Sequence, residues 1–334
     1  MIAVPILAQQ DNRPSRQCVQ EIRALCGSDR AQIRSCLAQR SSELSDECSA
    51  QLQQRIQQRL QQQGRGEAPR GGGVRPAQSV PADRTVIYGD HQRQQIDIYA
   101  PGRAADPAPL VLFIHGGGWS FGNHKSTVQS KPAHFTSAGY YFASTGYRLL
   151  PDAPVETQAA DVGAAIAALR TDAAEIGFDP DRIVLMGHSA GAHLAALVAS
   201  DPQYAGEAFG AIAGVVLLDG AGYNVSAQMQ GGDNELPQIY ARAFGTDPAR
   251  QAALSPITHV GGSDAPHWLA LYVAERQGSK AQSEALAAAL AAAGASAEAL
   301  AITGTDHGRM NRELGTAAGA EQTRAVDAFL ARIF

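Results

Sequence analysis

From residue 82 to residue 334, apolar runs of strand length alternate with alanine-rich segments of helical periodicity. Candidate strands lie at 84–88, 94–99, 110–114, 140–145, 183–186, 215–218, 268–273 and 298–302. Candidate helices lie at 157–176, 190–200, 280–293 and 318–333. Runs such as 110–114 and 183–186 are apolar throughout, as expected where helices cover both faces of a parallel sheet. The pattern predicts an α/β domain with a mostly parallel, eight-stranded sheet whose first two strands form an antiparallel edge.

All four cysteines, Cys18, Cys26, Cys36 and Cys48, fall in the first 48 residues. This confinement predicts a small disulfide-stapled module in front of a large cysteine-free domain. On one helix, Cys18 and Cys26 would lie about 12 Å apart, which is too far for a disulfide. We therefore expect Cys18 to pair with Cys36 or Cys48. The spacing contains no Cys-x2-4-Cys pair, which argues against zinc as the use of these cysteines.

Composition divides the chain into four segments. Residues 1–8 are apolar and resemble the end of a secretory h-region with cleavage after Ala8, although a basic n-region is missing. Residues 9–63 read as a helical module, and residues 64–81 are a linker of Gly, Pro, Gln and Arg. The α/β domain occupies 82–334. We expect a secreted or periplasmic protein, the alternative being a disordered or docked tail at the N-terminus.

The net charge and the lengths of the apolar stretches argue against two classes of protein. With 27 basic and 32 acidic residues, the formal net charge is -5. This balance gives no electrostatic reason to expect nucleic acid as a partner. No stretch of about 18 consecutive apolar residues occurs, so we expect no integral membrane span.

The first of three motifs at strand ends is Gly187-His188-Ser189-Ala190-Gly191. It follows the candidate strand 183–186 and precedes the candidate helix 190–200. In Gly-x-Ser-x-Gly, the small flanking residues permit a tight strand-to-helix turn that exposes the serine hydroxyl. The pattern alone is weak, but its strand and helix context favours a nucleophile over a purely structural turn.

The second motif, His115-Gly116-Gly117-Gly118-Trp119, ends the candidate strand 110–114. Consecutive glycines allow backbone N–H groups to approach a developing oxyanion without Cβ interference. Such a loop could instead cradle a phosphate, but no Gly-Lys-Ser/Thr follows it.

The third motif, Gly304-Thr305-Asp306-His307-Gly308, follows the last candidate strand. A serine hydroxyl is a poor nucleophile until a base removes its proton. Among the nine histidines, only His307 is expected in a short loop directly after a late strand. We interpret His115 and His188 as local structural supports and His193 as a helix-packing residue.

Together these motifs resemble the α/β-hydrolase fold of the lipase and esterase superfamily, close to the hormone-sensitive-lipase-like and kynurenine-formamidase-like carboxylesterases. Further matches are Ile96-Asp97-Ile98-Tyr99-Ala100-Pro101, Tyr147-Arg148-Leu149 and Asp179-Pro180-Asp181-Arg182-Ile183. The resemblance implies that Ser189 is the nucleophile, that His307 is the base, and that the N–H groups of Gly117, Gly118 and Ala190 form an oxyanion hole. The cysteine spacing separately resembles the cysteine-rich repeat of Golgi-type sialoglycoproteins.

The acid of this triad has two candidates. The family order is Ser, then Asp or Glu, then His, with the acid usually after the penultimate strand. Glu275 is the only carboxylate in the loop 274–278 and is the preferred candidate. The loop lacks the His-Gly-x-x-Asp sequence of many relatives. Asp219, at the end of the candidate strand 215–218, is the alternative.

The expected activity is hydrolysis of a carboxylic ester through an acyl-enzyme intermediate, without a metal or organic cofactor. Position in the chain makes Trp119, Phe121, Tyr223 and the segment 224–244 candidates for the substrate pocket and its cap. The best-fitting substrates are short-chain acyl, aryl or feruloyl esters, including esters linked to plant polysaccharide. Alternatives are an aryl-formamide hydrolase, a peptidase of the same fold, and a binding protein on a hydrolase fold. The N-terminal module is a candidate for protein interaction.

Overall fold

The computed structural model describes residues 15–27, 45, 48, 81–103, 107–230 and 237–334. The chain divides into two units, Met1–Val74 and Arg75–Phe334, which are described separately below. The predictions for residues 1–8, for Cys36 and for most of the segments 9–63 and 64–81 lie outside the described residues.

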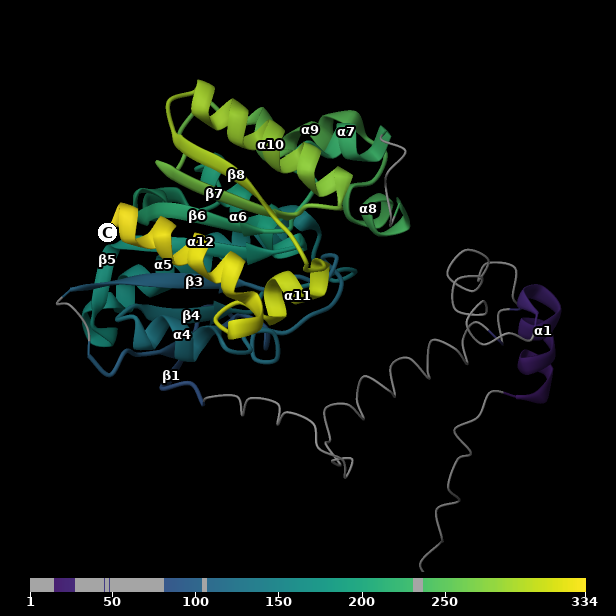
Figure 1. Cartoon of the computed structure of the whole chain (residues 1–334), viewed down its shortest axis with the longest axis horizontal. Helices are drawn as coiled ribbons and strands as arrows, with labels where there is room; N and C mark the ends of the chain where they lie inside the picture. The colour runs from purple at the N-terminus through teal and green to yellow at the C-terminus, as the bar shows by residue number, and fades with distance from the viewer. Residues whose placement is uncertain (1–14, 28–44, 46–47, 49–80, 104–106, 231–236) are drawn as a thin grey trace, which may run out of the picture. The chain divides into compact units, whose positions relative to one another are not determined.

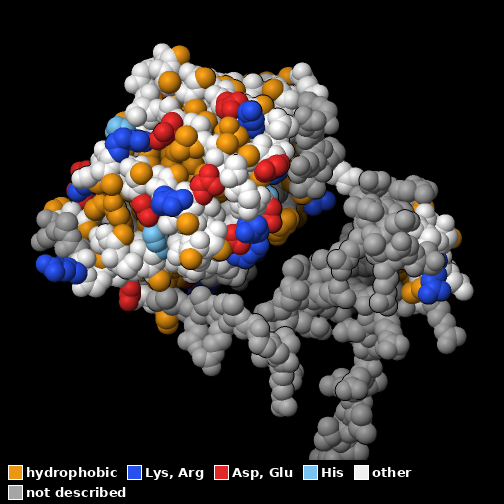
Figure 2. Space-filling model, viewed as in Figure 1, with side chains coloured by type: hydrophobic (Ala, Val, Ile, Leu, Met, Phe, Trp, Pro, Cys, Tyr) orange, Lys and Arg blue, Asp and Glu red, His pale blue; other side chains and the backbone are white. Residues whose placement is uncertain are grey.

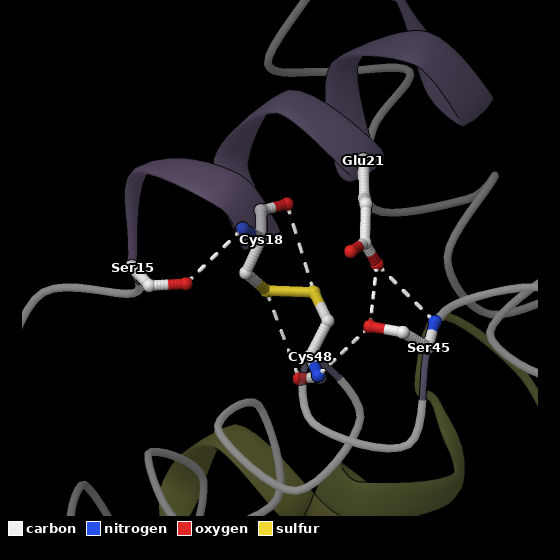
Figure 3. Close-up of a disulfide and its surroundings, with 5 residues drawn as sticks. All are labelled: Ser15, Cys18, Glu21, Ser45 and Cys48. Carbon is white, nitrogen blue, oxygen red and sulfur yellow. Dashed lines mark hydrogen bonds between the residues drawn. A yellow bond between two sulfur atoms is a disulfide. The ribbon is translucent and has the colours of Figure 1, made fainter.

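In the first unit, helix α1 (Arg16–Cys26) carries two of the cysteines. Cys18 forms a disulfide with Cys48 (Figure 3), one of the two pairings expected for it. Cys26 is also disulfide-bonded. The Glu21 carboxylate supports this link because it accepts hydrogen bonds from the Ser45 N–H and hydroxyl, at 3.2 and 2.8 Å. Helix α1 is thus tied to the segment around Cys48 by a covalent bond and by hydrogen bonds.

The second unit is built on one eight-stranded sheet with the order β1-β2-β4-β3-β5-β6-β7-β8. The strands are β1 (Arg84–Ile87), β2 (Gln95–Tyr99), β3 (Ala108–Ile114), β4 (Tyr141–Thr145), β5 (Phe178–His188), β6 (Ile212–Leu218), β7 (His267–Val273) and β8 (Ser296–Ile302). Strands β1 and β2 pair antiparallel with each other, and β2 pairs antiparallel with β4. All later pairs are parallel. The predicted sheet and its antiparallel edge are confirmed.

Helices cover both faces of this sheet (Figure 1). The helices are α4 (Lys131–Ser137), α5 (Val155–Ile176), α6 (Ala190–Ser200), α7 (Val225–Gln230), α8 (Pro237–Phe244), α9 (Pro248–Ala253), α10 (Gln277–Ala292), α11 (His307–Arg312) and α12 (Ala320–Ile333). Short 3₁₀ turns are η2 (Gly206–Ala211), η3 (Pro256–Thr258) and η4 (Ala317–Gly319). Buried residues of α5, α6 and α10 share one core cluster, whereas those of α4, α11 and α12 share the other.

Strand β3 shows why the sequence requires these two layers. All seven of its residues are buried. Leu110 and Leu112 pack into the cluster under α5 and α6, and Val111 and Phe113 pack into the cluster under α4 and α12. Successive side chains of a strand point to opposite faces, so an apolar run needs cover on both sides.

Strand β5 and five short helices differ from the prediction. Strand β5 begins at Phe178 because that residue pairs with Ala108 across an irregularity in register. The sequence pattern predicts none of the helices α4, α7, α8, α9 and α11, because each is too short to show a clear helical periodicity. His307 is consequently the first residue of a helix and does not lie in a loop.

The surface and the helices of the described part add two observations. Acidic and basic side chains are interspersed among apolar ones on the face of the second unit that Figure 2 shows. Within the described ranges, no helix combines the length and the apolar character needed to cross a bilayer.

Candidate active site

Ser189 stands at the sharp turn between β5 and α6. Its φ of 56° is a left-handed value that costs energy for a residue with a side chain. The flanking glycines are required by space: a Cβ at Gly187 would lie 2.2 Å from the carbonyl oxygen of Gly191, and one at Gly191 would lie 2.1 Å from that of Ile114. The predicted tight strand-to-helix turn is present, and its serine lines a cavity.

His307 faces Ser189 from the N-terminus of α11. Its Nε2 atom lies 3.0 Å from Ser189 Oγ. The Asp306 carboxylate caps this helix by accepting a hydrogen bond of 2.7 Å from the Arg309 N–H. The cap fixes the first turn and with it the backbone of His307.

Asp219 completes the line of hydrogen bonds. Its Oδ2 atom lies 2.7 Å from Nδ1 of His307, and its Oδ1 atom accepts a bond of 3.1 Å from the Val273 N–H. The side chain is 0% exposed. A carboxylate at Nδ1 fixes the proton there, which leaves the Nε2 lone pair directed at the serine hydroxyl.

The prediction that the Glu275 carboxylate contacts His307 is wrong. The alternative candidate, Asp219, makes that contact. Glu275 is exposed, and its carboxylate makes no hydrogen bond or ion pair with the imidazole. The chain after Leu218 takes a left-handed turn, with φ 47° at Asp219, which turns that side chain inward. The usual position of the acid after the penultimate strand favours Glu275, and nothing in the local sequence predicts the left-handed backbone at Asp219.

Arg276 is a second charged group at this point, and sequence analysis missed it. Its Nη1 atom contacts Asp219 Oδ2 and lies 2.9 Å from His307 Nδ1. Burial alone raises the pKa of Asp219. The hydrogen bond from His307, the charge of Arg276 and the Val273 N–H outweigh burial, so the pKa falls below its usual value. The carboxylate is therefore ionised at neutral pH.

His188 links the elbow to the base. Its Nε2 atom lies 2.8 Å from the His307 carbonyl oxygen, and the two rings are 4.7 Å apart. Burial lowers the pKa of His188 to about 3, so the ring is neutral and donates through Nε2–H. This agrees with the structural role that the sequence indicated for it.

A cavity of about 510 Å³ opens onto Ser189 and His307. The three residues predicted to supply oxyanion N–H groups, Gly117, Gly118 and Ala190, all line it. Gly117 leaves no room for a side chain, because a Cβ on this residue, whose φ is 133°, would lie 2.0 Å from the carbonyl oxygen of Phe121.

The cavity has an apolar wall on the side of α8. Trp119 lines it, and its ring packs against Tyr240 and Phe244 with centroids 5.4 and 4.8 Å away. Ile239 lines the same wall. Phe121, also predicted for the pocket, lines the cavity. Tyr223, another predicted pocket residue, is fully buried and does not line it. It packs in the core beside Gly220, so its assignment to the pocket is corrected.

Another part of the lining, called here the polar wall, comes from the loop before α4 and from α11. Thr127, Gln129, Asn311 and Arg312 line it. Among the described residues, no group of His, Cys, Asp or Glu side chains is arranged to hold a metal ion.

The sheet order, the serine at the strand-to-helix turn and the histidine after the last strand define an α/β-hydrolase of the esterase and lipase superfamily. The model of the BD-FAE family matches residues 96–290. Because this match covers more than half of the chain, the protein belongs to the BD-FAE family.

Similar proteins carry esterase names. A probable isoprenylcysteine alpha-carbonyl methylesterase of Arabidopsis thaliana is 36% identical over 113 residues, covering 34% of this chain and 24% of that protein. A carboxylesterase of Mycobacterium tuberculosis is 36% identical over 117 residues, covering 35% of this chain and 37% of that protein. A propionate-bound esterase of Thermogutta terrifontis aligns with a TM-score of 0.62 and 25% identity, covering 78% of this chain and 97% of that one. The chain thus spans well under half the length of these two curated relatives.

Proposed function

We propose that this protein is a serine hydrolase that cleaves carboxylic esters. The observation that carries the proposal is the line of hydrogen bonds from Ser189 Oγ through His307 to Asp219, with spacings of 3.0 and 2.7 Å, at the wall of a cavity. These are the contacts that a nucleophile, a general base and an orienting acid require.

The proposed reaction has two steps. Ser189 Oγ attacks the ester carbonyl carbon while His307 Nε2 accepts its proton, and the alcohol leaves with that proton as the acyl-enzyme forms. Water then attacks the acyl group, His307 again accepts a proton, and the carboxylic acid leaves as Ser189 recovers its hydrogen. Asp219 stays ionised and stabilises the imidazolium in both steps.

The backbone N–H groups of Gly117, Gly118 and Ala190 are proposed to bind the oxyanion of each tetrahedral intermediate. Their support is position, since all three residues border the cavity beside Ser189. Ala190 is the first residue of α6, where backbone N–H groups have no helical partner and favour negative charge.

The substrate is proposed to be a short-chain acyl ester or an aryl or feruloyl ester. The aromatic wall around Trp119 and Tyr240 suits an apolar or aromatic group, and about 510 Å³ is enough for one ring with its substituents. The polar wall suits a hydroxylated alcohol, such as an ester on polysaccharide. The esterase names of the relatives support the reaction class.

Export to a secreted or periplasmic location remains part of the proposal. Its support is the Cys18–Cys48 disulfide, a bond that persists in oxidising compartments. The N-terminal module is proposed to act in interaction and not in catalysis. Deletion of residues 1–80 should leave ester hydrolysis within about twofold, and a larger loss would assign the module to catalysis.

A substrate screen tests the function. Wild type and Ser189→Ala would be compared on p-nitrophenyl acetate to octanoate, feruloyl esters, acetylated sugars and N-formylkynurenine. We expect ester turnover by wild type only, with the highest kcat/KM on short or aryl esters. Turnover of N-formylkynurenine above every ester would instead assign the protein as a formamide hydrolase, and equal rates for the two proteins would contradict the proposed nucleophile.

A further inference from the structure

Lys131 is a buried lysine that the proposed chemistry does not use. It is the first residue of α4 and is 0% exposed. Its ammonium donates to the carbonyl oxygen of Asn311 at 2.8 Å and to Gln129 Oε1 at 3.3 Å. It also approaches the carbonyl oxygens of Val128 and Thr127, at 3.4 and 3.5 Å. All four of these acceptors are neutral.

Such a group is costly to bury. The ammonium lies 4.7 Å from the centre of the Phe113 ring, and burial lowers the pKa of Lys131 to about 7. Burying a charged group without a charged partner costs free energy, even where hydrogen bonds offset part of that cost. Stability alone therefore gives a weak reason for a lysine at this position. The segments that its hydrogen bonds connect point to another role.

The ammonium joins the two segments that form the polar wall of the cavity. Thr127 and Gln129 belong to the loop before α4, and Asn311 belongs to α11. The Asn311 side chain reinforces the junction, since its Nδ2 donates to the Thr127 carbonyl oxygen at 3.4 Å and to Gln129 Oε1 at 3.3 Å. Gln129 has a left-handed backbone, with φ 46°, which these bonds help to hold.

Helix α11 carries His307 at its first position and is only six residues long. A helix of this length is not stable by itself in water and depends on external contacts. Two buried donors supply them at opposite ends: His188 bonds to the His307 carbonyl oxygen at 2.8 Å, and Lys131 bonds to that of Asn311 at 2.8 Å. The lysine thus fixes the far end of the helix that presents the imidazole.

We propose that Lys131 is a positioning residue for His307, which it aligns with Ser189 by clamping α11 to the loop 127–129. It touches neither the reacting atoms nor the substrate. This role rests on the proposed function, because it assigns His307 as the base. The expected signature is a loss of turnover without a matching loss of substrate affinity, since small displacements of a reacting group are costly.

The test replaces Lys131 with methionine, which keeps the length and removes the donors. We expect kcat on p-nitrophenyl acetate to fall about 10- to 100-fold with KM within about threefold. A fluorophosphonate should label Ser189 more slowly by a similar factor, because labelling needs the same base but no ester. Lys131→Arg, which keeps the charge and the donors, should be faster than Lys131→Met in both measurements.

Lys125→Met is the matched control, because Lys125 is an exposed lysine of the same loop. It should label at the wild-type rate. If Lys131→Met melts at a lower temperature yet labels at the wild-type rate while folded, the residue is merely structural and the proposal is overturned. If Lys131→Met does not fold, Lys131→Gln decides: slow labelling supports the role and wild-type labelling overturns it. Wild-type protein that neither labels nor hydrolyses esters would contradict the proposed function, and this role with it.

Discussion

His307 Nδ1 lies 2.7 Å from Oδ2 of Asp219, a carboxylate that follows β6 and is held from the end of β7 by the Val273 N–H. The imidazole is therefore oriented by the strand next to the one that presents Ser189. The loop after β7 contributes Arg276, a cation, where a carboxylate was expected. The buried Asp219 carboxylate and the partly exposed Arg276 guanidinium form a charge pair beside the imidazole.

Exchanging the two candidate acids separates their roles. Asp219→Asn should lower kcat about 10²- to 10⁴-fold, because the amide no longer favours the Nδ1–H tautomer or the imidazolium. Glu275→Gln should stay within twofold of wild type, since that side chain is exposed. Hydrolysis of p-nitrophenyl acetate measures both effects, and thermal unfolding checks that each variant is folded. The reverse ranking would return the role to Glu275.

The glycine loop offers a test of the oxyanion geometry. Gly117→Ala places a Cβ 2.0 Å from a backbone oxygen, so the loop must move. We expect kcat/KM to fall about 100-fold or more, as when an oxyanion donor is displaced. Gly102→Ala is the control, because a Cβ there meets no atom within 4 Å. A Gly117→Ala variant with wild-type kinetics would show that this loop does not bind the oxyanion.

The wall on α8 should set the acyl length. Ile239 Cγ2 lies 3.0 Å from the position of a Cβ on Gly118, next to the proposed oxyanion site. Ile239→Ala opens this space, and we expect the ratio of kcat/KM for octanoate to that for acetate to rise about tenfold. An unchanged ratio across the p-nitrophenyl series would place the acyl group elsewhere in the cavity.

Acid should destabilise the fold through its buried histidines. Burial lowers the pKa of His193 to about 4 from an ordinary value of 6.5. Between these two pH values the unfolded chain binds a proton that the folded chain does not, so the free energy of unfolding falls as the pH falls. The contribution is up to about 1.4 kcal/mol per pH unit.

Urea unfolding at several pH values measures this dependence. In His193→Gln, the free energy of unfolding should change less steeply with pH between pH 6 and pH 4.5 than in wild type. The difference in slope should be up to about 1.4 kcal/mol per pH unit, the effect of one proton. His115 and His188, whose pKa values burial lowers to about 4 and about 3, keep a residual slope in the variant. An identical slope in the two proteins would show that His193 accepts its proton in the folded state.

The fold could be predicted from the sequence because its information is local. The length of the apolar runs at 110–114 and 183–186 predicts strands, and the periodicity and length of the alanine-rich segments predict helices. The turn at Ser189 could also be predicted from the sequence, because the close contacts around such a turn require glycines at its flanking positions.

The parts that sequence could not supply depend on tertiary packing. Asp219 contacts His307 in the fold and has a left-handed backbone, and no local sequence pattern near an aspartate predicts either feature. The burial of Lys131 could not be predicted, because a lysine in a sequence predicts a solvated side chain. Only the fold shows that this side chain is buried. For Arg276 a signal existed: it stands directly after Glu275 in a loop expected to face the site.

The most direct test of the central claim is to trap the acyl group on Ser189. Rapid acid quench of the protein mixed with p-nitrophenyl acetate, followed by peptide mass spectrometry, should find one acetyl group on the peptide that contains Ser189. The same treatment of Ser189→Ala should find none there. Ester turnover with the acetyl group absent from Ser189, or undiminished turnover by Ser189→Ala, would contradict the account.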